Sequence, residues 1–160
     1  MDLSLISHNI GLTKQDNLKW LTYARALSKG EKVSRDAIPS YKDPCGSCQW
    51  LYDHSDDVDL LYQKMERSGV ELFHFDIMEQ IEILRYELHD RYLHLFKICF
   101  FDFNNFFFAA LFRHNRPMSE SSKKEVLHYL DEMQEIVDEL QKKLDYLEVS
   151  LFHFCRLNIA

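Results

Sequence analysis

The C-terminal part of the chain, residues 119–160, carries the most regular pattern of apolar positions. After a first step of four, its apolar residues alternate spacings of three and four. That is the heptad pattern of a helix that packs along a supercoiled seam. An intramolecular bundle seam and a parallel dimer stalk both fit it, and Ser119 is placed to cap the helix. The positions are Val126, Leu130, Met133, Val137, Leu140, Leu144, Leu147, Leu151 and Phe154.

A second apolar pattern at spacings of three and four runs from Val70 to Phe112 and predicts one very long helix, with a break near 102–105. Its end, 100–112, is rich in phenylalanine, but Lys97 and the polar residues at 102–105 interrupt it, so we expect no membrane span. A helix buried in a bundle or a dimer interface is the expectation, and a lipid-facing or partner-binding aromatic patch is the alternative. The positions are Phe73, Ile77, Ile81, Leu84, Leu88, Tyr92, Leu95 and Cys99.

Two shorter helices precede these. We expect the first to be capped by Thr13, with Asp16 three residues on, and to stop at Gly30. A short helix between Val58 and Gly69 completes a four-helix-type bundle with two long C-terminal helices. The fold class is therefore all-α, and 1–160 is one domain. The face of the first helix consists of Asn17, Trp20, Leu21, Ala24 and Leu27.

Composition supports this interpretation and narrows the function. Four glycines and three prolines in 160 residues are too few for a sandwich or barrel. The net charge of −7 argues against a nucleic-acid partner. The N-terminus has no basic segment followed by an apolar run, and four cysteines without such a signal indicate a reducing, cytoplasmic setting. The chain has no G-x-S-x-G, phosphate loop or H-E-x-x-H motif, so we do not expect an enzyme.

The sequence Cys45-x-x-Cys48 is the main chemical motif. Its spacing lets two thiolates share a metal, and redox pairs use the same spacing. A redox protein of the thioredoxin type needs a βαβ frame, which the pattern does not show. A metal site needs further ligands from elsewhere in the chain.

The order of these pieces resembles the chemoreceptor zinc-binding domain family. That family pairs a His-x-x-Trp helix with a Cys-x-[Leu/Phe]-Gly-x-Trp-[Leu/Ile] turn and a His-x-x-x-His helix. Residues 45–51 here read Cys-Gly-Ser-Cys-Gln-Trp-Leu, and residues 17–20 read Asn-Leu-Lys-Trp. The resemblance is strongest over residues 13–75.

The third motif has two alignments. In residues 70–74, Val70 replaces one histidine and His74 keeps the other. In residues 85–89, which require an insertion, Arg85 replaces one and His89 is kept. The resemblance implies zinc as a cofactor, with Cys45, Cys48 and His74 as ligands and His89 as the alternative ligand. Asn17 and Val70 stand at substituted ligand positions.

The resemblance also implies a function. Such domains are sensory or regulatory modules in chemoreceptors and ahead of diguanylate cyclases, often as dimers. We therefore expect a homodimer that controls an output domain through helix packing, with 119–160 as a signalling stalk. One alternative is a metal-independent structural dimerisation module. Another is a di-iron protein of haemerythrin type, suggested by His74 and Glu79.

Overall fold

Three helices make up the regular structure of the computed structural model. It describes residues 3–31 and 33, the separate positions 53, 56, 63 and 67, and residues 77–111 and 118–157. The side chains of Leu3, Ile6, Met78, Leu151, 100–111 and 154–157 lie outside that description. The helices are α1 (Leu3–Ser28), α4 (Ile77–Leu111) and α5 (Glu120–Leu157). No strand occurs in the described residues, which confirms the predicted all-α class for this part of the chain.

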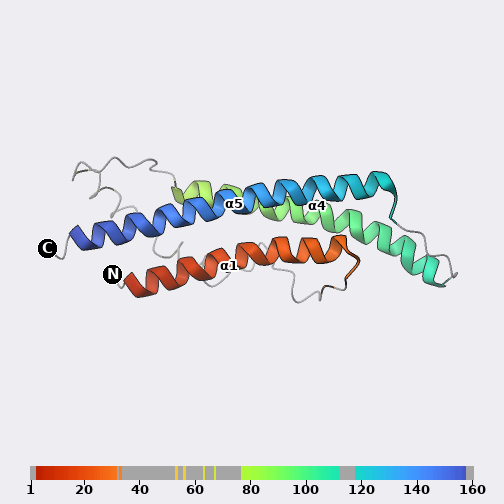
Figure 1. Ribbon diagram of the computed structural model, residues 1–160, viewed down its shortest axis with the longest axis horizontal. Helices are drawn as coiled ribbons and strands as arrows, with labels where there is room; N and C mark the ends of the chain where they lie inside the picture. Colours follow the sequence, from red (N-terminus) through yellow and green to blue (C-terminus); the bar gives the residue numbers. More distant parts are fainter. Residues whose placement is uncertain are drawn as a thin grey trace.

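Helices α1 and α4 run in the same direction, and α5 runs antiparallel along both (Figure 1). The cross-helix contacts give the register of α1 and α5. Arg25 donates a hydrogen bond to Gln134 at 2.6 Å, and Lys14, earlier in α1, reaches Glu148, later in α5. The start of α1 and the end of α5 therefore lie at the same end of the bundle.

The parallel arrangement of α1 and α4 bears on the predicted fourth helix. Two parallel neighbours require a connection that returns along the bundle, and the short helix expected between Val58 and Gly69 falls in that connection. Its residues lie outside the described ranges apart from two separate positions. The four-helix arrangement therefore stays a prediction.

The predicted start of the first helix is wrong. The helix α1 begins at Leu3, ten residues before Thr13, so Thr13 caps nothing. Its hydroxyl instead donates to the carbonyl oxygen of Asn9 at 3.0 Å, one turn back within the helix. The N-terminal half of α1 buries a polar stripe, Asn9, Thr13 and Asn17, which an apolar pattern does not reveal.

Two predicted helix ends are confirmed. Gly30 has a φ of 76° and its N–H bonds to the carbonyl of Leu27, while the N–H of Glu31 bonds to the carbonyl of Ala26. This pair of bonds is the Schellman motif, which favours glycine because the backbone is left-handed there. At the start of α5, the hydroxyl of Ser119 accepts a bond from the N–H of Ser122 at 3.1 Å, as an N-cap does.

The core follows the predicted seams closely. On α5 the described seam positions are buried except Leu130, which is partly buried; the buried ones are Val126, Met133, Val137, Leu140, Leu144 and Leu147. These side chains pack against α1 and α4 of the same chain. Between 126 and 147, the heptad seam thus serves as an intramolecular bundle seam.

The long helix α4 contributes the opposite face. It runs from Ile77 to Leu111 without the predicted break near 102–105. Within the described part of the chain, none of the helices has the combination of length and apolar content needed to cross a membrane. The described residues of α4 that are buried are Ile77, Ile81, Leu88, Tyr92, Leu95 and Cys99.

Candidate functional site

Most of the predicted metal ligands fall outside the described residues. This applies to Cys45, Cys48 and His74, and to the substituted position Val70. Among the residues that are described, no three His, Cys, Asp or Glu side chains gather as they would around a metal ion. The described members of the predicted set are Asn17 on α1 and His89 on α4.

Asn17 is a polar residue held in the core. Its side chain is 1% exposed, and the amide nitrogen Nδ2 has no hydrogen-bond partner among the described residues. Leaving a buried donor unpaired costs about 1–3 kcal/mol. A buried polar group without a partner among the described residues is a position to examine for a bound water, a ligand or a functional role.

Trp20, one turn after Asn17, lies between two residues of α4. Its ring meets His89 edge to face, with centroids 5.1 Å apart, and meets Tyr92 in the same manner at 5.0 Å. His89 is half-buried, and burial lowers the pKa of its imidazole, an effect that the neighbouring carboxylate of Asp90 partly offsets. The neutral imidazole is therefore the favoured form in the folded chain.

This contact gives the level at which α1 and α4 meet. Because the two helices are parallel and Trp20 lies level with residues 89–92, Asn17, three residues earlier, lies near the level of residues 86–89. The described residues thus bring together the Asn-x-x-Trp segment and the alternative motif 85–89. Of its ligand positions only His89 carries a zinc-binding side chain, so these described residues do not by themselves fit a zinc ion.

Tyr92 adds a second unpaired polar group to the same interface. Its side chain is fully buried, and its hydroxyl has no hydrogen-bond partner in the described structure. Burial raises the pKa of Tyr92 to about 12, with smaller contributions from Tyr23 and Cys99. The hydroxyl is therefore a protonated donor at neutral pH, and the described residues offer it no acceptor.

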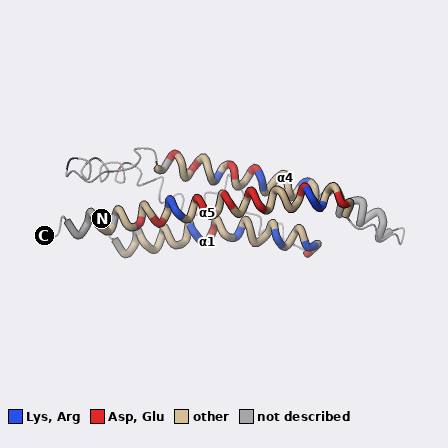
Figure 2. Tube along the Cα trace, turned by 45° about the horizontal axis from the view of Figure 1, so that its top comes forward, with Lys and Arg blue, Asp and Glu red and all other residues tan. Residues whose placement is uncertain are grey.

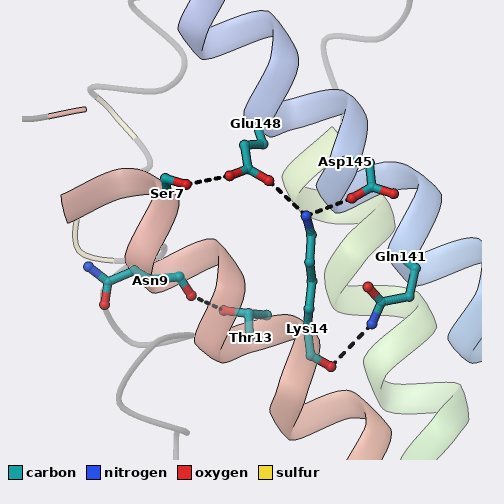
Figure 3. Close-up of polar contacts among 7 residues, drawn as sticks. All are labelled: Ser7, Asn9, Thr13, Lys14, Gln141, Asp145 and Glu148. Carbon is teal, nitrogen blue, oxygen red and sulfur yellow. Dashed lines mark hydrogen bonds and ion pairs between the residues drawn. The ribbon is translucent and has the colours of Figure 1, made fainter. Parts of the chain in front are cut away.

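A different polar cluster joins α1 to α5 (Figure 3). The ammonium Nζ of Lys14 lies 2.6 Å from a carboxylate oxygen of Asp145 and 2.8 Å from one of Glu148. The hydroxyl of Ser7 donates to the other oxygen of Glu148. The side-chain amide of Gln141 donates to the backbone carbonyl of Lys14 at 3.1 Å. We call these five residues the polar latch.

The latch holds both of its central charges in their ionised forms. Burial by itself would lower the pKa of Lys14, but the carboxylates of Asp145 and Glu148 raise it above 10.5. Burial by itself would raise the pKa of Glu148, but hydrogen bonds from Lys14 and Ser7 lower it below 4.5. The ion pair is therefore charged throughout the neutral range.

Charged side chains also make contacts that join α4 to α5. Arg91 Nε lies 2.8 Å from a carboxylate oxygen of Glu132, and Lys143 donates to the side chain of Gln80 at 2.6 Å. Acidic residues recur along both helices, with basic residues between them (Figure 2). These contacts fix the register of α5 on α4.

Sequence reasoning missed the polar latch, although a signal for it exists. Gln134, Gln141 and Glu148 are spaced by seven and lie beside the heptad seam, where flanking polar residues contact the neighbouring helix. In the structure all three contact α1.

Comparison with models of protein families, with curated proteins and with solved structures returned no match.

Proposed function

We propose that the chain is a sensory or regulatory helical domain that controls an output domain through the packing of α5. The observation that carries the proposal is the buried seam of α5, which packs on α1 and α4 along its length. Whatever alters the α1–α4 interface must then alter the surface on which α5 rests. A signal acts by binding one packing of such a bundle better than another.

The unpaired polar groups of Asn17 and Tyr92 support the α1–α4 interface as the receiving end. Both are buried, Tyr92 in contact with Trp20 and Asn17 one turn before Trp20, and neither polar atom has a partner among the described residues, which weakens the packing around it. A packing weakened in this way is closer in free energy to an alternative one. The proposal does not require zinc, although the resemblance implies it, and a homodimer remains part of the expectation.

A reporter fusion tests the proposal. The chain is joined through α5 to a diguanylate cyclase catalytic domain, the output that the resemblance implies, and product formation is measured. Replacing Asn17 by Leu should change the output several-fold, because it removes the unpaired amide at the receiving end. Leu18→Ala is the matched control, since Leu18 is the adjacent residue and is exposed. Equal output from all three folded proteins would refute the proposal.

A structural dimerisation module is the second candidate, and one observation favours it. Three large apolar residues at spacings of three, Tyr146, Val149 and Phe152, are exposed on the outer side of α5. Val149 is 66% exposed, and an exposed apolar patch is the kind of surface that marks a protein interaction site.

Sedimentation distinguishes this candidate. If the patch forms a dimer, Val149→Lys should shift the chain to monomer, whereas Leu127→Lys, at an exposed position near the other end of α5, should not. A native chain that sediments as a monomer at tens of micromolar removes the candidate.

Among the described residues, nothing favours the haemerythrin-type alternative.

A further inference from the structure

The two halves of α1 bury side chains of different character. In the half that follows Asn17 every buried residue is apolar: Trp20, Leu21, Ala24 and Leu27. In residues 7–17, here called the arm, the buried residues are Asn9, Ile10, Thr13 and Asn17, of which only Ile10 is apolar. Because burial of apolar surface is the main stabilising term in folding, the arm is held less firmly than the rest of α1.

The buried polar groups of the arm do little to hold it in place. Asn9 donates to the carbonyl of Leu5 and Thr13 donates to the carbonyl of Asn9, so these bonds stay inside α1 and do not reach another helix. Asn17, at the boundary with the apolar half, has no partner for its Nδ2 among the described residues when the arm is packed. That amide is hydrated once the arm opens, which favours opening.

Gly11 weakens the helix in the middle of the arm. A glycine inside a helix is destabilising relative to alanine because its backbone loses more freedom on folding. Nothing lies within 4 Å of the position that a Cβ would take at Gly11, so packing does not require a glycine there. Its effect is to lower the stability of this stretch alone.

We infer that the arm is a conformational switch, which opens from residues 141–150 of α5 while residues 20–28 stay packed, and which the polar latch holds closed. Lys14 is the centre of the latch, and its partners Gln141, Asp145 and Glu148 all lie on that stretch of α5 (Figure 3). Opening breaks these contacts together and uncovers part of the α5 seam. The regulatory meaning of this opening rests on the function proposed above, whereas the opening itself does not.

Residue-resolved amide hydrogen exchange on the full chain tests the inference. Amides 8–17 should exchange faster than amides 20–28, with a step in protection near Asn17. Lys14→Met, which removes the charge and keeps the aliphatic stem, should speed exchange in the arm about two- to fivefold. Gly11→Ala should slow exchange in the arm about fivefold. Because this substitution stabilises the helix, it tests the inference even if Lys14→Met fails to fold.

The matched control is Lys19→Met. Lys19 pairs with Asp16 inside α1 at 2.6 Å and contacts no other helix through that pair, so arm exchange should stay within twofold of the native rate. Equal protection on both sides of Asn17 would overturn the inference. A gradual profile of exchange protection along α1 that neither Lys14→Met nor Gly11→Ala changes would also overturn the inference, because that profile is ordinary fraying of a helix end. Neither result bears on the reporter fusion, so the two proposals fail separately.

Discussion

Trp20 of α1 meets His89 of α4 edge to face, with ring centroids 5.1 Å apart and ring planes at 88°. The contact joins the tryptophan of the first motif to the alternative predicted ligand of the third, and the two residues are 69 positions apart in the sequence. His74, the other candidate, lies outside the described residues.

The same contact predicts how stability depends on pH. Burial lowers the pKa of His89 below its ordinary value of 6.5. The unfolded chain therefore binds more protons than the folded chain between those two values, and the free energy of unfolding falls as the pH drops through about 6.5. Urea unfolding at about pH 7.5 and about pH 5.5 should show a smaller loss of stability for His89→Gln than for the native chain.

A matched variant separates His89 from the other histidines. His8→Gln, at an exposed position on the first turns of α1, is the matched variant and is measured over the same pH range. If His89→Gln and the native chain lose the same free energy of unfolding over this range, burial of the imidazole is not what sets the dependence.

The periodicity of apolar residues predicted α4 and α5 well because burial along one helix is a local property. Leu140, Leu144 and Leu147 repeat with the helical period, and each is fully buried. The start of α1 was missed for a related reason. Asn9 and Thr13 follow the same period but are polar, so an apolar pattern treats them as loop.

The cross-helix contacts could not be predicted in the same way. Whether Lys14 meets Glu148 depends on the direction and register of two helices that are far apart in the sequence. A sequence pattern identifies the face on which a residue lies but not what that face meets. The Cys45–Cys48 motif is the reverse case. It is easy to recognise in the sequence, but its residues lie outside the described ranges.

Removing the hydroxyl of Tyr92 should not weaken the protein. Because that hydroxyl is buried without a partner, Tyr92→Phe should be neutral or stabilise the fold by up to about 1 kcal/mol in urea unfolding. Tyr92→Leu is the contrasting variant, and it should destabilise by about 1 kcal/mol or more because it loses the aromatic contact with Trp20. A clear loss of stability in Tyr92→Phe would mean that a buried water or ligand accepts the bond.

The pairing of Lys14 with Glu148 should give a measurable coupling energy. Their side chains are 18% and 24% exposed, so a double-mutant cycle of Lys14→Met and Glu148→Gln should yield about 1 kcal/mol at low salt. In 1 M NaCl, where the screening length is about 3 Å, the coupling should shrink. The pair Lys19–Asp16, whose lysine is 56% exposed, is the control and should give about 0.3 kcal/mol.

The same coupling should have a defined pH window. The pKa of Glu148 is lowered, so its contribution is present above about pH 4.5 and is lost as the pH falls through the folded value. The pKa of Lys14 is raised, so its contribution is present below about pH 10.5 and is lost as the pH rises through the folded value. A coupling that changes between about pH 6 and about pH 9 would contradict this assignment.

Asn17 provides the test of the zinc-binding resemblance. Asparagine is a poor zinc ligand, and the resemblance implies a histidine at this position, so Asn17→His should raise the affinity for zinc. At free zinc about 100-fold above Kd, binding should stabilise the variant by about 2.7 kcal/mol, which corresponds to about 5–10 °C in Tm. The effect should disappear with a chelator and in the double variant with Cys45→Ala. Asn17→Gln, which adds no imidazole, is the matched control.

Three outcomes of that titration lead to different conclusions. Stabilisation of Asn17→His but not of the native chain would support the ligand positions that the resemblance implies, with Asn17 as the substitution that weakens the site. Stabilisation of the native chain itself would point to a site that does not need residue 17, such as the predicted set Cys45, Cys48 and His74. If zinc stabilises neither protein, the resemblance does not extend to the metal, and the buried amide of Asn17 must be explained by the packing of α1 on α4 alone.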